Sequence, residues 1–252
     1  MAYSSRFWPI WKVIDRRMNR REMIIQSMPQ IKNALPRLST VNSCVMISCG
    51  NFDMEFVCWC LPNVRQLTVV EPDADQMAEL KPRVSQLLPN VSSDFCQETA
   101  QNWKGADQPF DAVLLFHCLY HVPRLERPAL FKKLFDNIVA DGGYVFVLIA
   151  PYNSENPSVF DRLKFSLMNE SMAIDGIQIS DMMRSAGFCE CYQLPITVKV
   201  DMEEPDDDLM ALFMHWNEGR LSCEQVREAA KEVVGGEKII PHESWLGVFR
   251  KP

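Results

Sequence analysis

The chain has 252 residues, of which 47% are hydrophobic and 23% are charged, a balance typical of a globular protein with one large core. Its net charge of −7 disfavours nucleic acid as a partner, because proteins that bind nucleic acid usually present a basic surface. The sequence has no apolar run of ~18 residues and no apolar stretch of leader length, so we expect a cytoplasmic protein without a membrane partner.

Nine cysteines are scattered along the chain. Cys58 and Cys60 form one C-x-C pair and Cys189 and Cys191 form another, but neither has the paired C-x₂-C spacing of a structural zinc site. We therefore expect reduced, mostly buried thiols and no metal site.

Hydrophobic periodicity predicts that strands and helices alternate along the first part of the chain. Residues 1–35 have the pattern of an amphipathic helix. Strands are then expected at the apolar runs 43–49, 66–71, 90–97, 110–120 and 144–150, and helices at 53–61, 72–88 and 127–143. Pro72 suits the first position of its helix, and the glycines at 142–143 suit a helix end.

The last hundred residues continue the pattern with three further helices and two further strands. The helices are expected at 159–167, 179–187 and 208–216, and the strands at 191–200 and 244–250, at the far edge of the same sheet. This order predicts an α/β fold with a doubly wound, seven-stranded, mostly parallel sheet of the Rossmann-like kind. We divide the chain into an N-terminal helical segment (1–40), a core (41–150) and a second set of helices and strands in the same domain (151–252).

The spacing of Gly50 and Glu71 points to a nucleoside-binding edge. In an open α/β sheet, ligands bind beyond the carboxyl ends of the strands. Gly50 follows the first expected strand, and Glu71 ends the second, 21 residues later, where a carboxylate can accept hydrogen bonds from both hydroxyls of a ribose. A plain tight turn at Gly50, with Glu71 stabilising a helix dipole, is the alternative.

The loop between these residues reads Ser-Cys-Gly-Asn-Phe-Asp (48–53) and has a single glycine. Phe52 and Asp53 oppose the pyrophosphate of a dinucleotide, the first by its bulk and the second by its charge. S-Adenosylmethionine carries no phosphate and demands less of the loop. Asn51 can adopt the left-handed backbone that a glycine would otherwise provide.

Two longer motifs, VVEPDADQMAELK (69–81) and FDAVLLFHCLYHV (110–122), resemble those of the histamine N-methyltransferases, which are class I S-adenosylmethionine-dependent enzymes. Shorter matches at 97–99, 179–192, 208–214 and 238–249 extend the resemblance along nearly the whole chain. The resemblance implies a class I methyltransferase fold with an N-terminal lid, S-adenosylmethionine as cofactor, a small cationic amine as substrate, and a monomer.

The resemblance and the loop together assign residues to two sites. The cofactor-binding residues are Cys49, Gly50, Asn51, Glu71, Gln76, Thr99, Ala100 and Phe116. The substrate-binding residues are Trp8, Trp11, Glu22, His117, Tyr120, Phe160, Phe165, Phe213 and Glu243. His117 and Glu243 stand where the family has a glutamine and an asparagine, so the substrate need not be histamine.

Catalysis is assigned to His117, Glu22 and Glu243. An amine attacks only as the free base, so we expect His117 to accept or orient its proton, while the two glutamates anchor the rest of a cationic substrate. The alternatives are an O- or S-methyltransferase of a small metabolite, and a non-catalytic ligand-binding relative with a degenerate loop. An NAD-dependent enzyme is disfavoured by Phe52 and Asp53.

Overall fold

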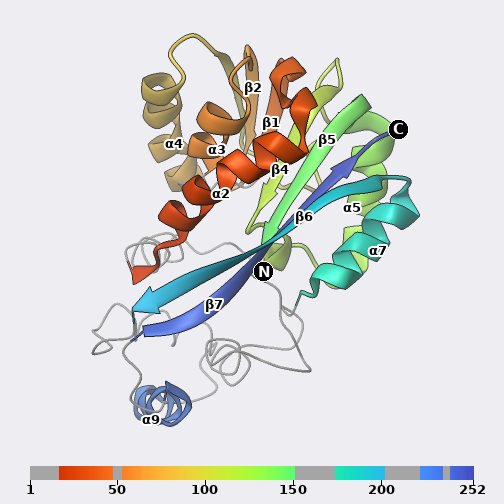
Figure 1. Ribbon diagram of the computed structural model, residues 1–252. Helices are drawn as coiled ribbons and strands as arrows, with labels where there is room; N and C mark the ends of the chain where they lie inside the picture. The colour runs from red at the N-terminus through yellow and green to blue at the C-terminus, as the bar shows by residue number, and fades with distance from the viewer. Residues whose placement is uncertain (1–16, 48–52, 151–173, 202–221, 235–238) are drawn as a thin grey trace.

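The computed structural model describes residues 17–47, 53–150, 174–201, 222–234 and 239–252, which form a layered α/β domain (Figure 1). Its seven-stranded sheet has the order β3-β2-β1-β4-β5-β7-β6. The strands are β1 (Ser43–Ile47), β2 (Gln66–Val70), β3 (Ser92–Cys96), β4 (Phe110–Phe116), β5 (Val139–Ile149), β6 (Cys189–Asp201) and β7 (Ile239–Arg250). The first five are parallel, and β7 runs antiparallel to both its neighbours, which confirms the predicted doubly wound sheet.

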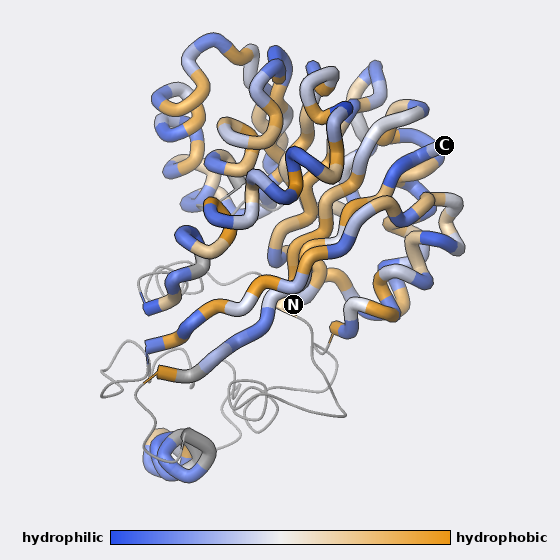
Figure 2. The backbone as a smooth tube through the Cα atoms, viewed as in Figure 1, coloured by the Kyte–Doolittle hydropathy of each residue, from blue (hydrophilic) through white to orange (hydrophobic). Residues whose placement is uncertain are grey.

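Helices cover both faces of the sheet. One face carries α2 (Arg20–Ala34), α3 (Asp53–Cys60) and α4 (Ala74–Leu87), and the other carries α5 (Arg127–Lys133) and α7 (Gly176–Ala186) (Figure 1). A further helix, α9, spans Cys223–Val234. Successive side chains of a strand point to opposite faces, so Met46 packs with α2–α4 and Val45 packs with α5 and α7. Figure 2 shows the resulting concentration of hydrophobic residues along the central strands.

One predicted helix is interrupted and another begins later than expected. Met18 forms a bridge with Val200 of β6, so the helical pattern is broken at Met18 and Asn19 and α2 begins at Arg20. Pro72 lies before α4 instead of at its first position, because Asp73 is the N-cap and its carboxylate accepts a hydrogen bond from the backbone N–H of Gln76 at 2.8 Å. The expected part of the first helix before residue 17, and the helices at 159–167 and 208–216, lie outside the described residues.

We expect Asp73→Ala to lower the free energy of unfolding by ~1 kcal/mol, because it removes the N-cap of α4. Asp73→Asn is the matched control, since an asparagine amide oxygen also caps well. Urea denaturation of the two variants and the wild type measures the difference. Equal losses in both variants would show that the cap hydrogen bond is not what Asp73 contributes.

Two predicted boundaries around β4 and β5 are wrong. β4 ends at Phe116 instead of residue 120, because His117 adopts a left-handed backbone with φ of 52° and a 3₁₀ turn follows at Leu119–His121. The helix expected at 127–143 ends earlier: α5 stops at Lys133, a π-helical turn spans Leu134–Ile138, and β5 begins at Val139.

The glycines at 142–143 lie inside β5 instead of ending a helix. The β4–β5 register shifts beside them, and Gly142 has φ of 76°. A Cβ atom at Gly143 would lie 2.8 Å from the carbonyl oxygen of Ala140, so only glycine fits this irregular part of the strand.

The cysteines depart from the prediction in their burial. None of the eight described cysteines forms a disulfide, but Cys189, Cys191 and Cys223 are exposed. Cys189 and Cys191 lie at the start of β6, which is the edge strand of the sheet. Helix α7 covers only part of this strand. Burial is more complete at Cys60 and raises the pKa of its thiol to about 12.

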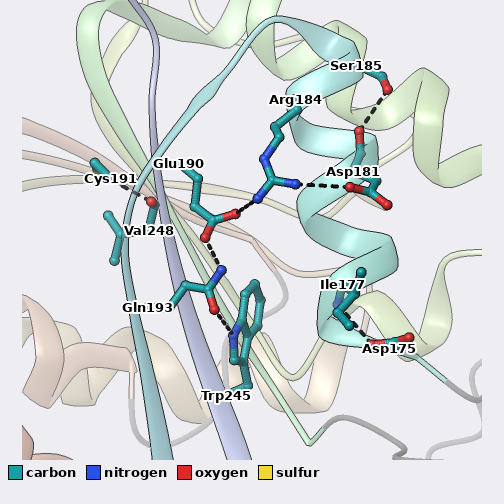
Figure 3. Close-up of polar contacts among 10 residues, drawn as sticks. All are labelled: Asp175, Ile177, Asp181, Arg184, Ser185, Glu190, Cys191, Gln193, Trp245 and Val248. Carbon is teal, nitrogen blue, oxygen red and sulfur yellow. Dashed lines mark hydrogen bonds and ion pairs between the residues drawn. The ribbon is translucent and has the colours of Figure 1, made fainter.

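A chain of polar contacts joins α7 to the antiparallel edge of the sheet (Figure 3). Arg184 of α7 pairs with Asp181 at 3.0 Å and with Glu190 of β6 at 2.7 Å. Glu190 also accepts a hydrogen bond from Gln193, whose amide oxygen accepts one from the indole of Trp245 in β7.

None of the described helices is long and apolar enough to cross a membrane.

Strands β6 and β7 continue together past the end of β5. The β5–β7 pairing stops at Ile149 and Trp245, whereas β6 and β7 remain paired as far as Asp201 and Ile239. Residues 196–201 and 239–244 therefore form a two-stranded extension beyond the carboxyl edge of the parallel strands (Figure 1). Asn19, just before α2, is hydrogen-bonded to Lys199 through both its backbone N–H and its side chain, so the start of α2 is fixed to this extension.

Candidate active site

The carboxyl ends of β1 to β4 meet at one edge of the sheet, on either side of the point where the strand order reverses. β1 lies between β2 and β4, so the chain after β1 and the chain after β4 run in opposite directions. In open α/β sheets, ligands bind at such a reversal of strand order. The residues that follow the strands at this edge are Glu71 after β2, Thr99 and Ala100 after β3, and His117 after β4.

Glu71 is completely buried at the end of β2. One carboxylate oxygen accepts the backbone N–H of Asp73 at 2.9 Å, and the backbone N–H of Glu71 donates to the carbonyl of Cys96 in β3 at 3.1 Å. Gln76, in the first turn of α4, is also buried. These contacts hold an acidic side chain in one orientation at the position where a ribose is expected.

The segment after β3, residues 97–103, which we call the post-β3 loop, contains Thr99 and Ala100. The hydroxyl of Thr99 accepts the backbone N–H of Asn102 at 3.2 Å, and Ala100 is 9% exposed. Trp103 anchors the end of the loop by packing against Phe110 at the start of β4, with 6.0 Å between ring centroids. The two predicted cofactor residues therefore lie on an ordered turn that follows β3, the strand whose last residue, Cys96, is hydrogen-bonded to Glu71.

His117 lies directly after β4, and its left-handed backbone turns the chain away from the sheet. Its backbone N–H donates to the carbonyl of Leu148 in β5 at 2.7 Å, and its half-buried ring stacks on Tyr120 with 6.2 Å between centroids. The hydroxyl of Tyr120 in turn accepts the backbone N–H of Ala150, which follows β5. The two predicted substrate residues are thus stacked on each other and attached to the ends of two adjacent strands.

Phe116 lies beneath this edge. It is 2% exposed and contacts the ring of Phe56 edge-on, with 5.1 Å between centroids, so the described contacts place it in the core. Its role in cofactor binding stays a prediction.

Glu22 and Glu243 lie on elements that meet at the β6–β7 extension. Glu22 is exposed in the first turn of α2 and accepts a hydrogen bond from Gln26 at 3.0 Å. Glu243 is exposed on β7 opposite Thr197. The structure brings neither carboxylate to His117 by a described contact. The remaining predicted site residues lie outside the described residues: Trp8, Trp11, Cys49, Gly50, Asn51, Phe160, Phe165 and Phe213.

Sequence reasoning missed the polar residues on either side of Glu243. His242 and Ser244 are each 1% exposed and face the side of the extension opposite to Glu243. The sequence offered no signal for them, since Pro-His-Glu-Ser (241–244) has no alternation of apolar and polar residues and Pro241 disfavours a strand. Sequence reasoning also missed Lys133 of α5, whose ammonium group donates to three carbonyls of the post-β3 loop.

These side chains fit an adenosine. Glu71 offers a buried carboxylate that can accept hydrogen bonds from a diol, and Ala100, after the neighbouring strand, has a small side chain. α3, the helix that follows β1, begins at Asp53, and an acidic residue in the first turn of a helix disfavours a phosphate there by its charge. The donor set therefore suits S-adenosylmethionine better than a dinucleotide.

Comparison with solved structures identifies the fold. A protein of Bacillus halodurans C-125 assigned to the methyltransferases has a TM-score of 0.62 and 13% identity, and the match covers 87% of this chain and 98% of that one. N-methyltransferase NodS from Bradyrhizobium japonicum WM9 has a TM-score of 0.54 and 12% identity, with coverage of 93% and 98%. A cyclopropane synthase from Mycobacterium tuberculosis has a TM-score of 0.55 and 10% identity, with coverage of 88% and 84%.

No curated protein matches the chain in sequence. A family model described as a methyltransferase domain, in contrast, matches residues 19–189, which include the β1–β5 core and every cofactor-edge residue described above. This match and the sheet order agree, and the chain belongs to the methyltransferase-domain family, with the fold of the S-adenosylmethionine-dependent enzymes.

Proposed function

We propose that this protein transfers a methyl group from S-adenosylmethionine to a nitrogen of a small cationic amine. The observation that carries the proposal is the fully buried carboxylate of Glu71 at the end of β2. A carboxylate that follows the second strand of such a sheet can accept hydrogen bonds from both hydroxyls of a ribose. The solved complex of NodS with S-adenosylhomocysteine supports the same cofactor class, since NodS shares the fold.

Four groups of this chain would hold the cofactor. Glu71 accepts hydrogen bonds from the ribose, Gln76 lies in the adjacent first turn of α4, and Thr99 and Ala100 border the adenine. When bound, S-adenosylmethionine supplies an electrophilic methyl group on a sulfonium. No covalent enzyme intermediate is then needed, so the task of the protein is to align the acceptor with that methyl group.

The assignment of an amine as acceptor rests on His117 and Tyr120. An amine nitrogen must lose its proton to attack, and an imidazole at the end of β4 can accept or orient that proton. The ring of Tyr120, stacked on His117, offers an aromatic face that tolerates a cation. Glu22, from α2, and Glu243, from the extension, would contribute negative charge, as the resemblance to the histamine N-methyltransferases implies.

The fold itself leaves the acceptor open. Solved structures that share it include a cyclopropane synthase and a [4+2]-cyclase as well as an N-methyltransferase. An O- or S-methyltransferase of a small metabolite is therefore the second candidate, and it would use the same cofactor edge.

The test has two stages. Isothermal titration with S-adenosylhomocysteine measures cofactor binding, and a Kd in the micromolar range is expected. Wild-type protein is then incubated with methyl-labelled S-adenosylmethionine and a panel of primary amines, imidazoles, phenols and thiols, with mass spectrometry of the products. Label on amines only supports the proposal, label on phenols or thiols only favours the second candidate, and no binding of cofactor at millimolar concentration contradicts both.

A further inference from the structure

Helix α5 places a half-buried cation against the post-β3 loop. The ammonium group of Lys133 donates to the carbonyl oxygens of Ala100 at 2.6 Å, Gln101 at 3.1 Å and Trp103 at 2.8 Å. An ammonium group has three donors, and here each has a backbone acceptor on the same short loop. Lys133 is separated from these acceptors by at least 30 residues of sequence, so the contact is tertiary.

The loop needs such a partner because it is a single helical turn. The backbone N–H groups of Asn102 and Trp103 both donate to the carbonyl of Thr99. The described chain does not continue as a helix after this turn, so no later helical N–H groups reach the carbonyls of residues 100–103. Unpaired carbonyls at the end of a helical turn carry partial negative charge, which a cation stabilises. Burial lowers the pKa of the ammonium group of Lys133, and the three carbonyls offset part of that cost.

The other end of α5 holds the segment that carries His117. Arg127, the first residue of the helix, is 1% exposed, and its Nε donates to the carbonyl of Val122 at 3.0 Å. Phe131, between the two cations, is completely buried and fixes the helix against the sheet. One short helix therefore restrains the chain after β3 and the chain after β4, the two segments that border the candidate active site.

We propose that Lys133 is a positioning residue for the adenosine part of the cofactor: it fixes the post-β3 loop so that Thr99 and Ala100 are held in place before the cofactor arrives. This inference rests on the proposed cofactor binding and adds to it. Lys133 acts through the loop and does not touch the cofactor. A pre-ordered loop lowers the entropy lost on binding, so removal of the ammonium group should reduce affinity without changing the reacting groups.

The test compares Lys133→Met with Lys132→Met. Methionine keeps most of the half-buried aliphatic stem of Lys133 and removes the charge. Lys132 is the exposed neighbour on the same helix, and it pairs with Asp136. In protein without cofactor, hydrogen exchange of the segment 97–104 is expected to speed up at least tenfold in Lys133→Met and to be unchanged in Lys132→Met. In Lys133→Met, the Kd of S-adenosylhomocysteine should rise roughly tenfold. The Kd of 5′-methylthioadenosine, which has the adenosine but no amino acid, should rise by the same factor. With a methyl acceptor, the KM for S-adenosylmethionine should rise while kcat changes less than twofold.

Each part of the result is decisive. Unchanged exchange at 97–104 would overturn the restraint itself, and that measurement needs no ligand. Faster exchange with unchanged Kd would overturn the positioning role. A loss for S-adenosylhomocysteine but not for 5′-methylthioadenosine would place the effect away from the adenosine and overturn the assignment. Wild-type protein that binds neither ligand would refute the proposed function and, with it, the cofactor role of Lys133, while the exchange data would still decide the restraint.

Discussion

Replacement of Glu71 by alanine is expected to weaken S-adenosylhomocysteine binding by ~100-fold or more. Hydrogen bonds to a charged group contribute about 1.5–3 kcal/mol each, and two ribose hydroxyls bonded to one carboxylate therefore account for at least two factors of ten. The carboxylate is already buried and oriented by the backbone N–H of Asp73, so little ordering is required of it on binding. Isothermal titration of the variant against the wild type measures the change.

Two further variants separate charge from structure. Glu71→Gln keeps an oxygen for the N–H of Asp73 but loses the charge, so we expect an intermediate loss of ~10-fold. Asp75→Asn removes an exposed carboxylate from the first turn of α4 and should leave the affinity unchanged. Thermal unfolding without ligand checks that each variant is folded. If a folded Glu71→Ala protein binds cofactor within about threefold of the wild type, Glu71 is not the ribose acceptor.

The sequence was sufficient for the parts of the fold that depend on local hydrophobic pattern. β1 and β2 are apolar runs that begin where predicted, and Glu71 could be placed because it is the first polar residue after such a run. Its proposed role as ribose acceptor followed from its distance of 21 residues from Gly50 and from the resemblance. What could be read locally was where β1 and β2 begin and which polar residue follows β2, at the edge where open α/β sheets bind ligands.

The errors arose where tertiary pairing outweighs local preference. Gly142 and Gly143 resemble a helix end, yet they allow a bulged β5 to pair with β4. Pro241 disfavours a strand, yet it is tolerated in β7 because the extension leaves one side of that strand without a ladder partner among the described strands. Lys133 lies on an amphipathic helix like many solvated lysines, and only the folded chain shows that it faces the carbonyls of a loop 30 residues away.

Replacement of His117 by glycine is expected to lower kcat by ~100-fold, within the range that a positioned proton acceptor contributes, and to change the Kd of S-adenosylhomocysteine less than threefold. Glycine suits this position because the backbone of His117 is left-handed, with φ of 52°, and glycine adopts that conformation without a penalty. The variant therefore removes the imidazole without straining the turn after β4. Single-turnover assays with a saturating amine acceptor measure the chemical step.

Added imidazole distinguishes a chemical role from a structural one. If the ring of His117 accepts the amine proton, free imidazole should fill the space beside Tyr120 in His117→Gly and restore part of the rate, whereas His117→Asn, which also tolerates the left-handed backbone, leaves less space and should not respond. Products must be identified by mass, so that methylation of imidazole itself is not counted. A His117→Asn or His117→Gly protein with more than half of the wild-type kcat would show that the histidine only shapes the turn, and the proton would then have to leave to solvent before the amine binds.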